Sequence, residues 1–174
     1  ALCMDPDINL DKKVYHSEMS HISRNRAIAY LLESKGYIEK NKDVENSLHF
    51  YVKMCSLSVT AESLAGLGLI LANDGIHPDT GKRLLSSQAV KIVKTLMFTC
   101  GMYDGSGEFA VRVGIPSKSG VGGGILSVVD GEMGIGIFGP ALDKKGNSVA
   151  GECVLEYMSH ELHLHMFHPQ RHTL

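Results

Sequence analysis

The chain has 174 residues, of which 44% are hydrophobic and 21% charged, and its formal net charge at pH 7 is −2. This composition is typical of a folded globular protein, and the length is enough for one domain with a sizeable core. Apolar stretches such as residues 65–72 are too short to span a bilayer, and no basic stripe indicates a nucleic-acid partner.

The chain has four cysteines, Cys3, Cys55, Cys100 and Cys153, which are widely spaced and form no C-x-x-C pair. Three of the four lie in apolar-periodic segments. This pattern predicts buried, reduced thiols in a cytoplasmic protein rather than a disulfide framework. Residues 1–6 contain no charged region before an apolar run, so they do not indicate a signal peptide. Their abrupt apolar start suggests a chain cut from something larger.

The first half of the chain is predicted to be helical. Apolar residues at helical spacing between Ile22 and Leu32 predict a helix that stops at Gly36. Three later helices are predicted from residues that can cap a helix N-terminus: Asp43, Thr60 and Ser86.

The pattern changes after residue 105. Alternating apolar residues over 109–113 predict a strand, and the apolar runs 125–129 and 133–138 predict a hairpin around the turn signal Asp130-Gly131. A last helix is expected over about residues 148–166. Helices, then antiparallel strands and a terminal helix, give an α+β architecture.

A short polar motif, Lys118-Ser119-Gly120, lies in the glycine-rich stretch 114–124. It offers a cation, a hydroxyl and space for a ligand to approach the backbone. The Walker spacing of a P-loop is absent, and an ordinary glycine-rich hairpin is the alternative. The motif matches the K-T-G element of serine acyl-transferases whose nucleophile lies in S-x-x-K. No serine or threonine here has a lysine three positions later, so such a nucleophile is expected outside this chain.

Three other residues could carry chemistry. Tyr103 lies in a tight turn after the fourth helix, where a phenol could donate a hydrogen bond or transfer a proton; a half-buried structural tyrosine is the alternative. Glu18 and Asn25 are seven residues apart and would share a face if they lay on one continuous helix. A carboxylate beside a carboxamide suits recognition of an α-amino acid. From these residues alone, an acid that complements the helix dipole and a solvated asparagine are the preferred interpretation.

Histidines cluster near the C-terminus, two of them at the i, i+3 spacing that can share a metal on a helix. No cysteine or suitable acidic set completes a site, so a polar helix end is the preferred interpretation and no metal is expected. The histidines are His160, His163, His165, His168 and His172.

Several longer motifs lie in the second half of the chain. They are the block from Thr99 to Phe109 (TCGMYDGSGEF), the block from Val113 to Val121 (VGIPSKSGV), GPALD at 139–143 and GNSV at 146–149. Together these motifs resemble the glutaminase family. Upstream, VYHSE with Arg24-Asn25, and Phe50-Tyr51 before Cys55-Ser56, follow in the same order. The resemblance covers about residues 5–168.

The resemblance implies the β-lactamase/transpeptidase-like fold, with this chain as its C-terminal part and the S-x-x-K segment missing. It implies that Glu18 and Asn25 hold the α-amino and α-carboxylate groups of glutamine, and that Tyr51 and Tyr103 flank the reacting amide. Tyr103 is the stronger candidate for proton transfer, with help from Lys118, and the Val121 N–H is assigned to the oxyanion hole.

The implied activity is hydrolysis of the L-glutamine side-chain amide through a serine acyl-enzyme, without metal or organic cofactor, in a cytoplasmic homo-oligomer (dimer or tetramer). Two alternatives stay open: a β-lactamase- or peptidase-like hydrolase, and a non-catalytic glutamine-binding module. A free amino acid needs recognition at both α groups, so Glu18 and Asn25 argue against peptide-like substrates.

Overall fold

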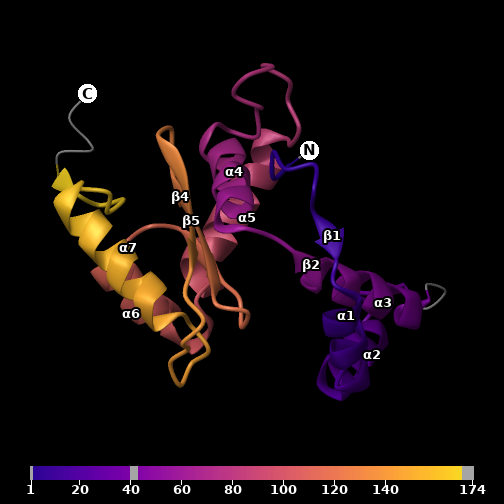
Figure 1. Cartoon of the computed structure of the whole chain (residues 1–174). Coiled ribbons are helices and arrows are strands. Elements are labelled where there is room, and N and C mark those ends of the chain that lie inside the picture. Colours follow the sequence, from indigo (N-terminus) through magenta and orange to yellow (C-terminus); the bar gives the residue numbers. More distant parts are fainter. Residues whose placement is uncertain (1, 40–42, 170–174) are drawn as a thin grey trace. The chain divides into compact units, whose positions relative to one another are not determined.

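The computed structural model describes residues 2–39 and 43–169, which form two compact units (Figure 1). The smaller unit comprises the described part of residues 7–59, and the larger unit that of residues 1–6 and 60–174. Both units contain helices and antiparallel strand pairs, which confirms the expected α+β class. Within the described ranges, no helix is both long and apolar enough to cross a bilayer.

The smaller unit is a helical cluster with one short strand pair. Its core consists of the buried side chains Ile22, Val44, Leu48 and Val52. Arg26 donates two hydrogen bonds, of 2.9 and 3.0 Å, to the Glu45 carboxylate. Its elements are β1 (Asn9–Leu10), α1 (Lys12–Ser20), α2 (Ser23–Ser34), α3 (Val44–Cys55) and β2 (Leu57–Ser58).

The larger unit is built around a three-stranded antiparallel sheet in the order β3-β4-β5. Helices α4 and α5 cover one face of this sheet, and α6 and α7 lie on the other side (Figure 1). The elements are α4 (Ala61–Ala72), α5 (Ser87–Cys100), the 3₁₀ turn η1 (Tyr103–Gly105), α6 (Ser106–Arg112), β3 (Ser117–Ser119), β4 (Gly124–Val129), β5 (Met133–Phe138) and α7 (Val149–Glu161).

The central strand β4 is buried on both faces because apolar side chains alternate along it. Ile125 and Val129 join the core with Phe109 and Leu155, on the α6 and α7 side. Leu126 and Val128 join a second core with residues of α4 and α5. Burial on two faces explains why the strand is an almost continuous apolar run.

Helix α4 lies directly on the backbone of β5 because β5 presents glycines to it. A Cβ atom on Gly136 would lie 2.7 Å from the Ala65 amide nitrogen, and one on Gly68 would lie 2.8 Å from the Gly134 Cα. Real side chains do not fit at such distances, so this close approach of helix and strand requires glycine.

Capping residues predict the helix starts correctly. The Asp43 carboxylate accepts a hydrogen bond from the Asn46 N–H at 3.0 Å. The Thr60 hydroxyl oxygen accepts a hydrogen bond from the Ser63 N–H, and the Ser86 hydroxyl oxygen accepts one from the Ala89 N–H. The hairpin of β4 and β5 is also confirmed, with Val129 opposite Met133.

The strand predicted over residues 109–113 is wrong, because this segment belongs to helix α6. Phe109 and Val113 are 3% and 0% exposed, whereas Val111 between them is 80% exposed. The two buried residues are four positions apart, so they share one helical face, and Val111 is an apolar residue on the surface. Gly114, with φ of 63°, follows the helix end.

Helix α7 begins as expected but ends at Glu161, five residues before the expected Met166. His163 adopts φ of 55°, the left-handed conformation in which helices often terminate. The Leu164 N–H then donates to the Ser159 carbonyl at 2.9 Å, and the Leu164 side chain is buried. A histidine therefore occupies the position where glycine is the usual signal.

The cysteines are free thiols, but the prediction that they are buried is wrong. Cys55, Cys100 and Cys153 are exposed, and Cys3 is half-buried. Each of the three exposed thiols lies on a helix, on the side away from the core.

Candidate active site

Tyr103 lies in a strained turn directly after α5. Its φ of 50° is left-handed, which is uncommon for a residue other than glycine and is often found at functional sites. The Ser106 hydroxyl holds this turn, because it accepts from the Met102 N–H at 3.0 Å and donates to the Tyr103 carbonyl at 2.8 Å. The Tyr103 side chain consequently remains 40% exposed at the surface of the larger unit.

Lys118 lies on β3, and the sheet directs its side chain outward. Its neighbours Ser117 and Ser119 are buried, whereas Lys118 is exposed. The Lys118 Nζ lies 4.8 Å from the centroid of the Tyr103 ring, and it also donates to the Ser119 carbonyl. The structure therefore brings the cation and the phenol ring together.

The K-S-G motif does not present all its groups to a ligand. The Ser119 side chain points into the protein, where its hydroxyl donates to the Asn147 side chain at 2.6 Å. The expectation that Ser119 supplies a ligand-facing hydroxyl is therefore wrong, because successive side chains of a strand face opposite sides. Gly120 does have open space around its Cα.

Gly101 allows β3 to approach the end of α5. The Ser119 N–H donates to the Gly101 carbonyl at 3.1 Å, so the strand is anchored two residues before Tyr103. A Cβ atom on Gly101 would overlap the Ser117 carbonyl oxygen. The contact between this helix end and β3 therefore depends on glycine.

Val121 lies in the turn that joins β3 to β4. This turn is closed by two hydrogen bonds of 2.9 Å, from Gly120 N–H to Gly124 O and from Gly123 N–H to Gly120 O. A methyl group placed on Gly146 would lie 3.7 Å from both the Tyr103 ring and Val121 Cγ1. Tyr103, Lys118 and Val121 thus form one exposed group in the larger unit.

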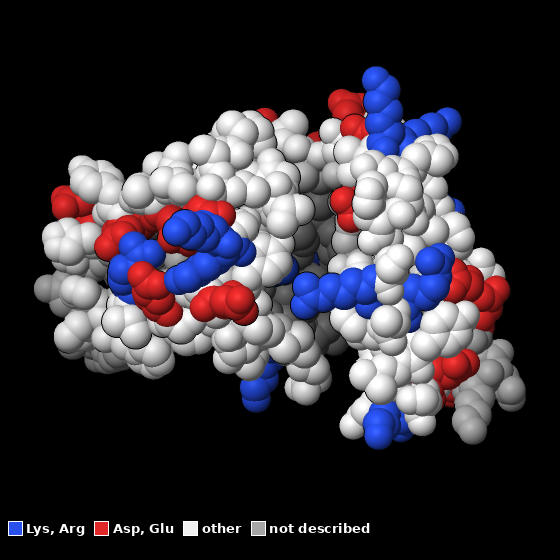
Figure 2. Space-filling view, turned by 90° about the horizontal axis from the view of Figure 1, so that it is seen from below, with Lys and Arg blue, Asp and Glu red and all other residues white. Residues whose placement is uncertain are grey.

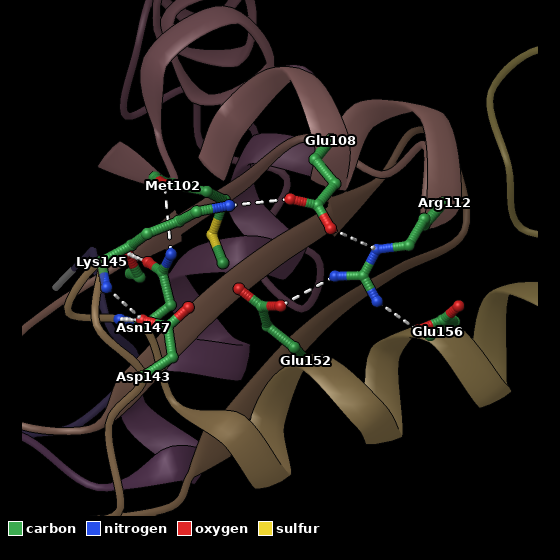
Figure 3. Close-up of polar contacts among 9 residues, drawn as sticks. Met102, Glu108, Arg112, Asp143, Lys145, Asn147, Glu152 and Glu156 are labelled. Atoms are coloured by element: carbon green, nitrogen blue, oxygen red, sulfur yellow. Dashed lines mark hydrogen bonds and ion pairs between the residues drawn. The ribbon is translucent and has the colours of Figure 1, made fainter. Parts of the chain in front are cut away.

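A charged network links α6, the loop before α7 and α7 itself (Figure 3). Glu108 accepts from Lys145 Nζ at 2.7 Å, and Arg112 contacts Glu152 and Glu156 at 2.9 and 2.6 Å. Figure 2 shows a surface patch, on the left of the view, in which acidic and basic side chains are intermixed. The hydrogen bond from Lys145, with its charge and that of Arg112, lowers the pKa of Glu108 below its ordinary value.

The loop before α7 is held by the Asp143 carboxylate. Asp143 Oδ1 accepts from the backbone N–H groups of Lys145 and Asn147, both at 2.9 Å. Hydrogen bonds from the backbone, the one from Asn147 foremost, lower the pKa of Asp143. Gly146 in the same loop adopts φ of 94°. The loop geometry is thus fixed mainly by one side chain.

The other predicted site residues belong to the smaller unit. Glu18 is exposed on α1, Asn25 is half-buried on α2, and Tyr51 is 53% exposed on α3. The interpretation that Glu18 and Asn25 share one continuous helix is wrong, since α1 ends at Ser20 and α2 begins at Ser23.

The break between α1 and α2 has a local cause. Ser20 Oγ donates to the Ser17 carbonyl at 2.7 Å, and His21 Nδ1 lies 2.9 Å from the same oxygen. Such local side-chain bonds compete with the main-chain bonds of a helix. Ile22 then turns inward and is buried in the core of the smaller unit.

The histidines from 160 to 168 surround a cavity of about 420 Å³ at the end of α7. His163 and His168 stack with ring centroids 4.5 Å apart. Across residues 2–39 and 43–169, no group of three or more histidine, cysteine, aspartate or glutamate side chains is arranged to hold a metal ion. His172 lies outside the described residues.

A family model described as "Glutaminase" matches residues 1–167. The chain is 55% identical over 161 residues to a glutaminase of Clostridium tetani, covering 92% of this chain and 52% of the relative. It is 54% identical over 166 residues to a glutaminase of Clostridioides difficile, covering 95% and 53%. The chain belongs to the glutaminase family, and it spans about half the length of these curated relatives.

Solved structures show the same relationship. A Bacillus subtilis glutaminase, in covalent complex with 5-oxo-L-norleucine after reaction with 6-diazo-5-oxo-L-norleucine, superposes with a TM-score of 0.86 at 42% identity. The match covers 92% of this chain and 57% of that one. A Bacillus glutaminase crystallised in high salt gives 0.87 at 41% identity, covering 95% and 56%.

Proposed function

We propose that the protein to which this chain belongs is a glutaminase, which hydrolyses the side-chain amide of L-glutamine to L-glutamate and ammonia. The observation that carries this proposal is the glutaminase match over residues 1–167. The compound that reacted with the Bacillus subtilis relative supports the substrate. It has the α-amino and α-carboxylate groups of glutamine and a ketone at the position of the side-chain carbonyl.

The proposed reaction is acyl transfer in two steps. A serine from an S-x-x-K segment upstream of this chain attacks the amide carbon of glutamine, and the C–N bond breaks as the leaving nitrogen takes a proton to form ammonia. Water then hydrolyses the γ-glutamyl ester, releasing glutamate and restoring the serine hydroxyl. These steps need only proton transfers and hydrogen bonds, so they require no metal or organic cofactor.

In this mechanism Tyr103 exchanges a proton with the reacting groups, and Lys118 stabilises the charge that develops on its oxygen. The distance of 4.8 Å from Lys118 Nζ to the Tyr103 ring supports the pairing of these two residues. The Val121 N–H is proposed to donate to the oxyanion of the tetrahedral intermediate, together with the N–H of the serine. A donor of this kind contributes about 3–4 kcal/mol to transition-state stabilisation.

Substrate recognition is proposed for the smaller unit. Glu18 is assigned to the α-ammonium group and Asn25 to the α-carboxylate, and Tyr51 is assigned to the reacting amide. The exposure of Glu18 and Tyr51 supports these assignments, because both side chains are open to a ligand.

We further propose the β-lactamase/transpeptidase-like fold, of which this chain would be the C-terminal part, and a cytoplasmic homo-oligomer, either a dimer or a tetramer. The sheet β3-β4-β5 with helices on both faces supports the fold. Free thiols at all four cysteines support a reducing compartment. The oligomer rests on the family resemblance alone, and light scattering of the purified full-length protein tests it.

The first experiment measures ammonia release from L-glutamine by the full-length protein, with the intact mass of the sample recorded. We expect turnover of glutamine and none of a penicillin. Glutamine binding without ammonia would support the non-catalytic module instead. Turnover by a verified 18.9 kDa chain would show that the nucleophile is one of the 174 residues of this chain.

A further inference from the structure

Asn147 connects the two segments that carry Tyr103 and Lys118. Its side chain is fully buried. Its Nδ2 donates to the Met102 carbonyl at 3.1 Å, one residue before Tyr103 (Figure 3). Its Oδ1 accepts from the Ser119 hydroxyl at 2.6 Å, one residue after Lys118. A single amide group therefore links the backbone carbonyl before Tyr103 to the side-chain hydroxyl after Lys118.

The orientation of this amide is determined by its partners. The Met102 carbonyl can only accept a hydrogen bond, so it must face the NH₂ group of Asn147. The Ser119 hydroxyl has one proton, which the shorter distance assigns to Asn147 at 2.6 Å rather than to the Gly101 carbonyl at 3.4 Å. The network is directional, and both ends of the amide have a partner.

The backbone of Asn147 is fixed as well. Its N–H donates to Asp143 Oδ1 at 2.9 Å, and its carbonyl accepts from the Asp143 N–H at 2.8 Å. A buried amide has no water to replace a lost partner, so removing either hydrogen bond costs the full desolvation of the group left behind. Asn147 is therefore a rigid connection rather than an adaptable one.

We propose that Asn147 is a positioning residue that fixes Tyr103 relative to Lys118. Its effect on turnover rests on the proposed glutaminase function, whereas its effect on the geometry of the pair does not. Without the amide, the Tyr103 turn and β3 lose one connection, although they keep the hydrogen bond from the Ser119 N–H to the Gly101 carbonyl, and the phenol moves relative to the ammonium group. A displacement of about 1 Å in a catalytic group can cost about a hundredfold in rate.

The test compares three variants of the full-length protein. Asn147→Ala removes both hydrogen bonds, and Ser119→Ala removes only the bond of 2.6 Å, in case the first variant does not fold. Ser159→Ala is the matched control, because the buried Ser159 hydroxyl donates to the Val113 carbonyl, also at 2.6 Å, and contacts neither Tyr103 nor Lys118. Each serine variant therefore loses one buried hydroxyl hydrogen bond of the same length.

Two readouts are taken for each variant at a temperature well below its Tm. One is the NMR signal of the Tyr103 ring in tyrosine-labelled protein, assigned with Tyr103→Phe. The other is the separation of kcat from KM for glutamine. We expect Asn147→Ala to shift the ring signal and to lower kcat about ten- to hundredfold, with KM changed less than about threefold. Ser119→Ala should show the same changes in smaller degree.

The outcomes separate this inference from the proposed function. An unchanged Tyr103 signal in both Asn147→Ala and Ser119→Ala overturns the inference, whatever the activity. Equal losses of kcat in Ser119→Ala and Ser159→Ala also overturn it, because they would reflect general destabilisation. If the wild-type protein releases no ammonia, the proposed function fails, and the ring signal alone decides whether Asn147 fixes the pair.

Discussion

The Nζ atom of Lys118 lies 4.8 Å from the centroid of the Tyr103 ring. The two residues are on different elements, β3 and the turn after α5, and they meet at the surface of the larger unit. The contact is a cation–π contact, in which the ammonium charge is attracted to the electron-rich face of the ring. This relationship makes Tyr103 the first residue to test.

We expect Tyr103→Phe to lower kcat for glutamine by about two to four orders of magnitude, because the variant keeps the ring and loses only the hydroxyl for which we propose proton transfer. Glutamine binding, measured by calorimetry, should remain. Tyr157→Phe is the control, since Tyr157 is an exposed tyrosine on α7. Near-normal ammonia release by Tyr103→Phe would remove this residue from the mechanism.

Glu18→Gln should raise KM for glutamine by about tenfold or more, because the variant loses the negative charge that we propose binds the substrate ammonium group. A tenfold increase corresponds to about 1.4 kcal/mol of binding free energy. Initial rates over a range of glutamine concentrations measure this change. Glu33→Gln on α2 removes a carboxylate from the same unit and serves as the control. If both variants keep the wild-type KM, Glu18 does not bind the substrate and is a structural residue of helix α1.

The stability contribution of Glu108 should depend on pH. Lys145 lowers the pKa of Glu108 below the ordinary value of 4.5, so the folded protein favours the carboxylate. The stabilisation is present above that value and is lost as the pH falls through the lowered pKa. We expect the Tm difference between wild type and Glu108→Gln to shrink between about pH 7 and about pH 3. A Tm difference that stays constant over this pH range would contradict this prediction.

Leu155→Ala should destabilise the larger unit by about 2–5 kcal/mol, because Leu155 is completely buried and the substitution leaves a cavity. Leu162→Ala, just after the same helix, is the control, since Leu162 is 54% exposed. Urea unfolding of the two variants measures the difference. Equal losses would place Leu155 outside the core.

Two glycine substitutions should have opposite effects. Gly136→Ala places a methyl group against the backbone of α4 and should cost at least about 1–3 kcal/mol. Gly107→Ala meets open space on helix α6 and should stabilise by about 0.5–1 kcal/mol. Thermal unfolding distinguishes the two, and a stabilising Gly136→Ala would contradict the close helix–strand packing.

Local chemistry made several elements predictable. Asp43, Thr60 and Ser86 each offer an oxygen to the first turn of the following helix, and the Asp130-Gly131 turn separates two apolar runs. The segment 109–113 was predicted wrongly because Val111 is apolar although it lies on the surface. With Phe109 and Val113 it gives the alternating pattern of a strand, while the segment is helical. The terminus of α7 was missed because a histidine takes the conformation expected of glycine.

The candidate site was predictable only in part. Tyr103 and Lys118 stand out in the sequence as functional groups in glycine-rich stretches, but their proximity depends on how β3 packs against the end of α5. The positioning role proposed for Asn147 cannot be predicted from the GNSV motif that contains it. Its partners are 28 and 45 positions away, so no local pattern indicates that its amide bridges them.

The glycine at position 101 limits which residues this position can hold. Where other residues carry a carbon, Gly101 carries a hydrogen, and the Ser117 carbonyl occupies the space. The methyl group of an alanine at this position would collide with the Ser117 carbonyl oxygen and push β3, which carries Lys118, away from the turn that contains Tyr103. The relative position of Tyr103 and Lys118 thus depends partly on the absence of a side chain at a third residue, which contributes no functional group itself.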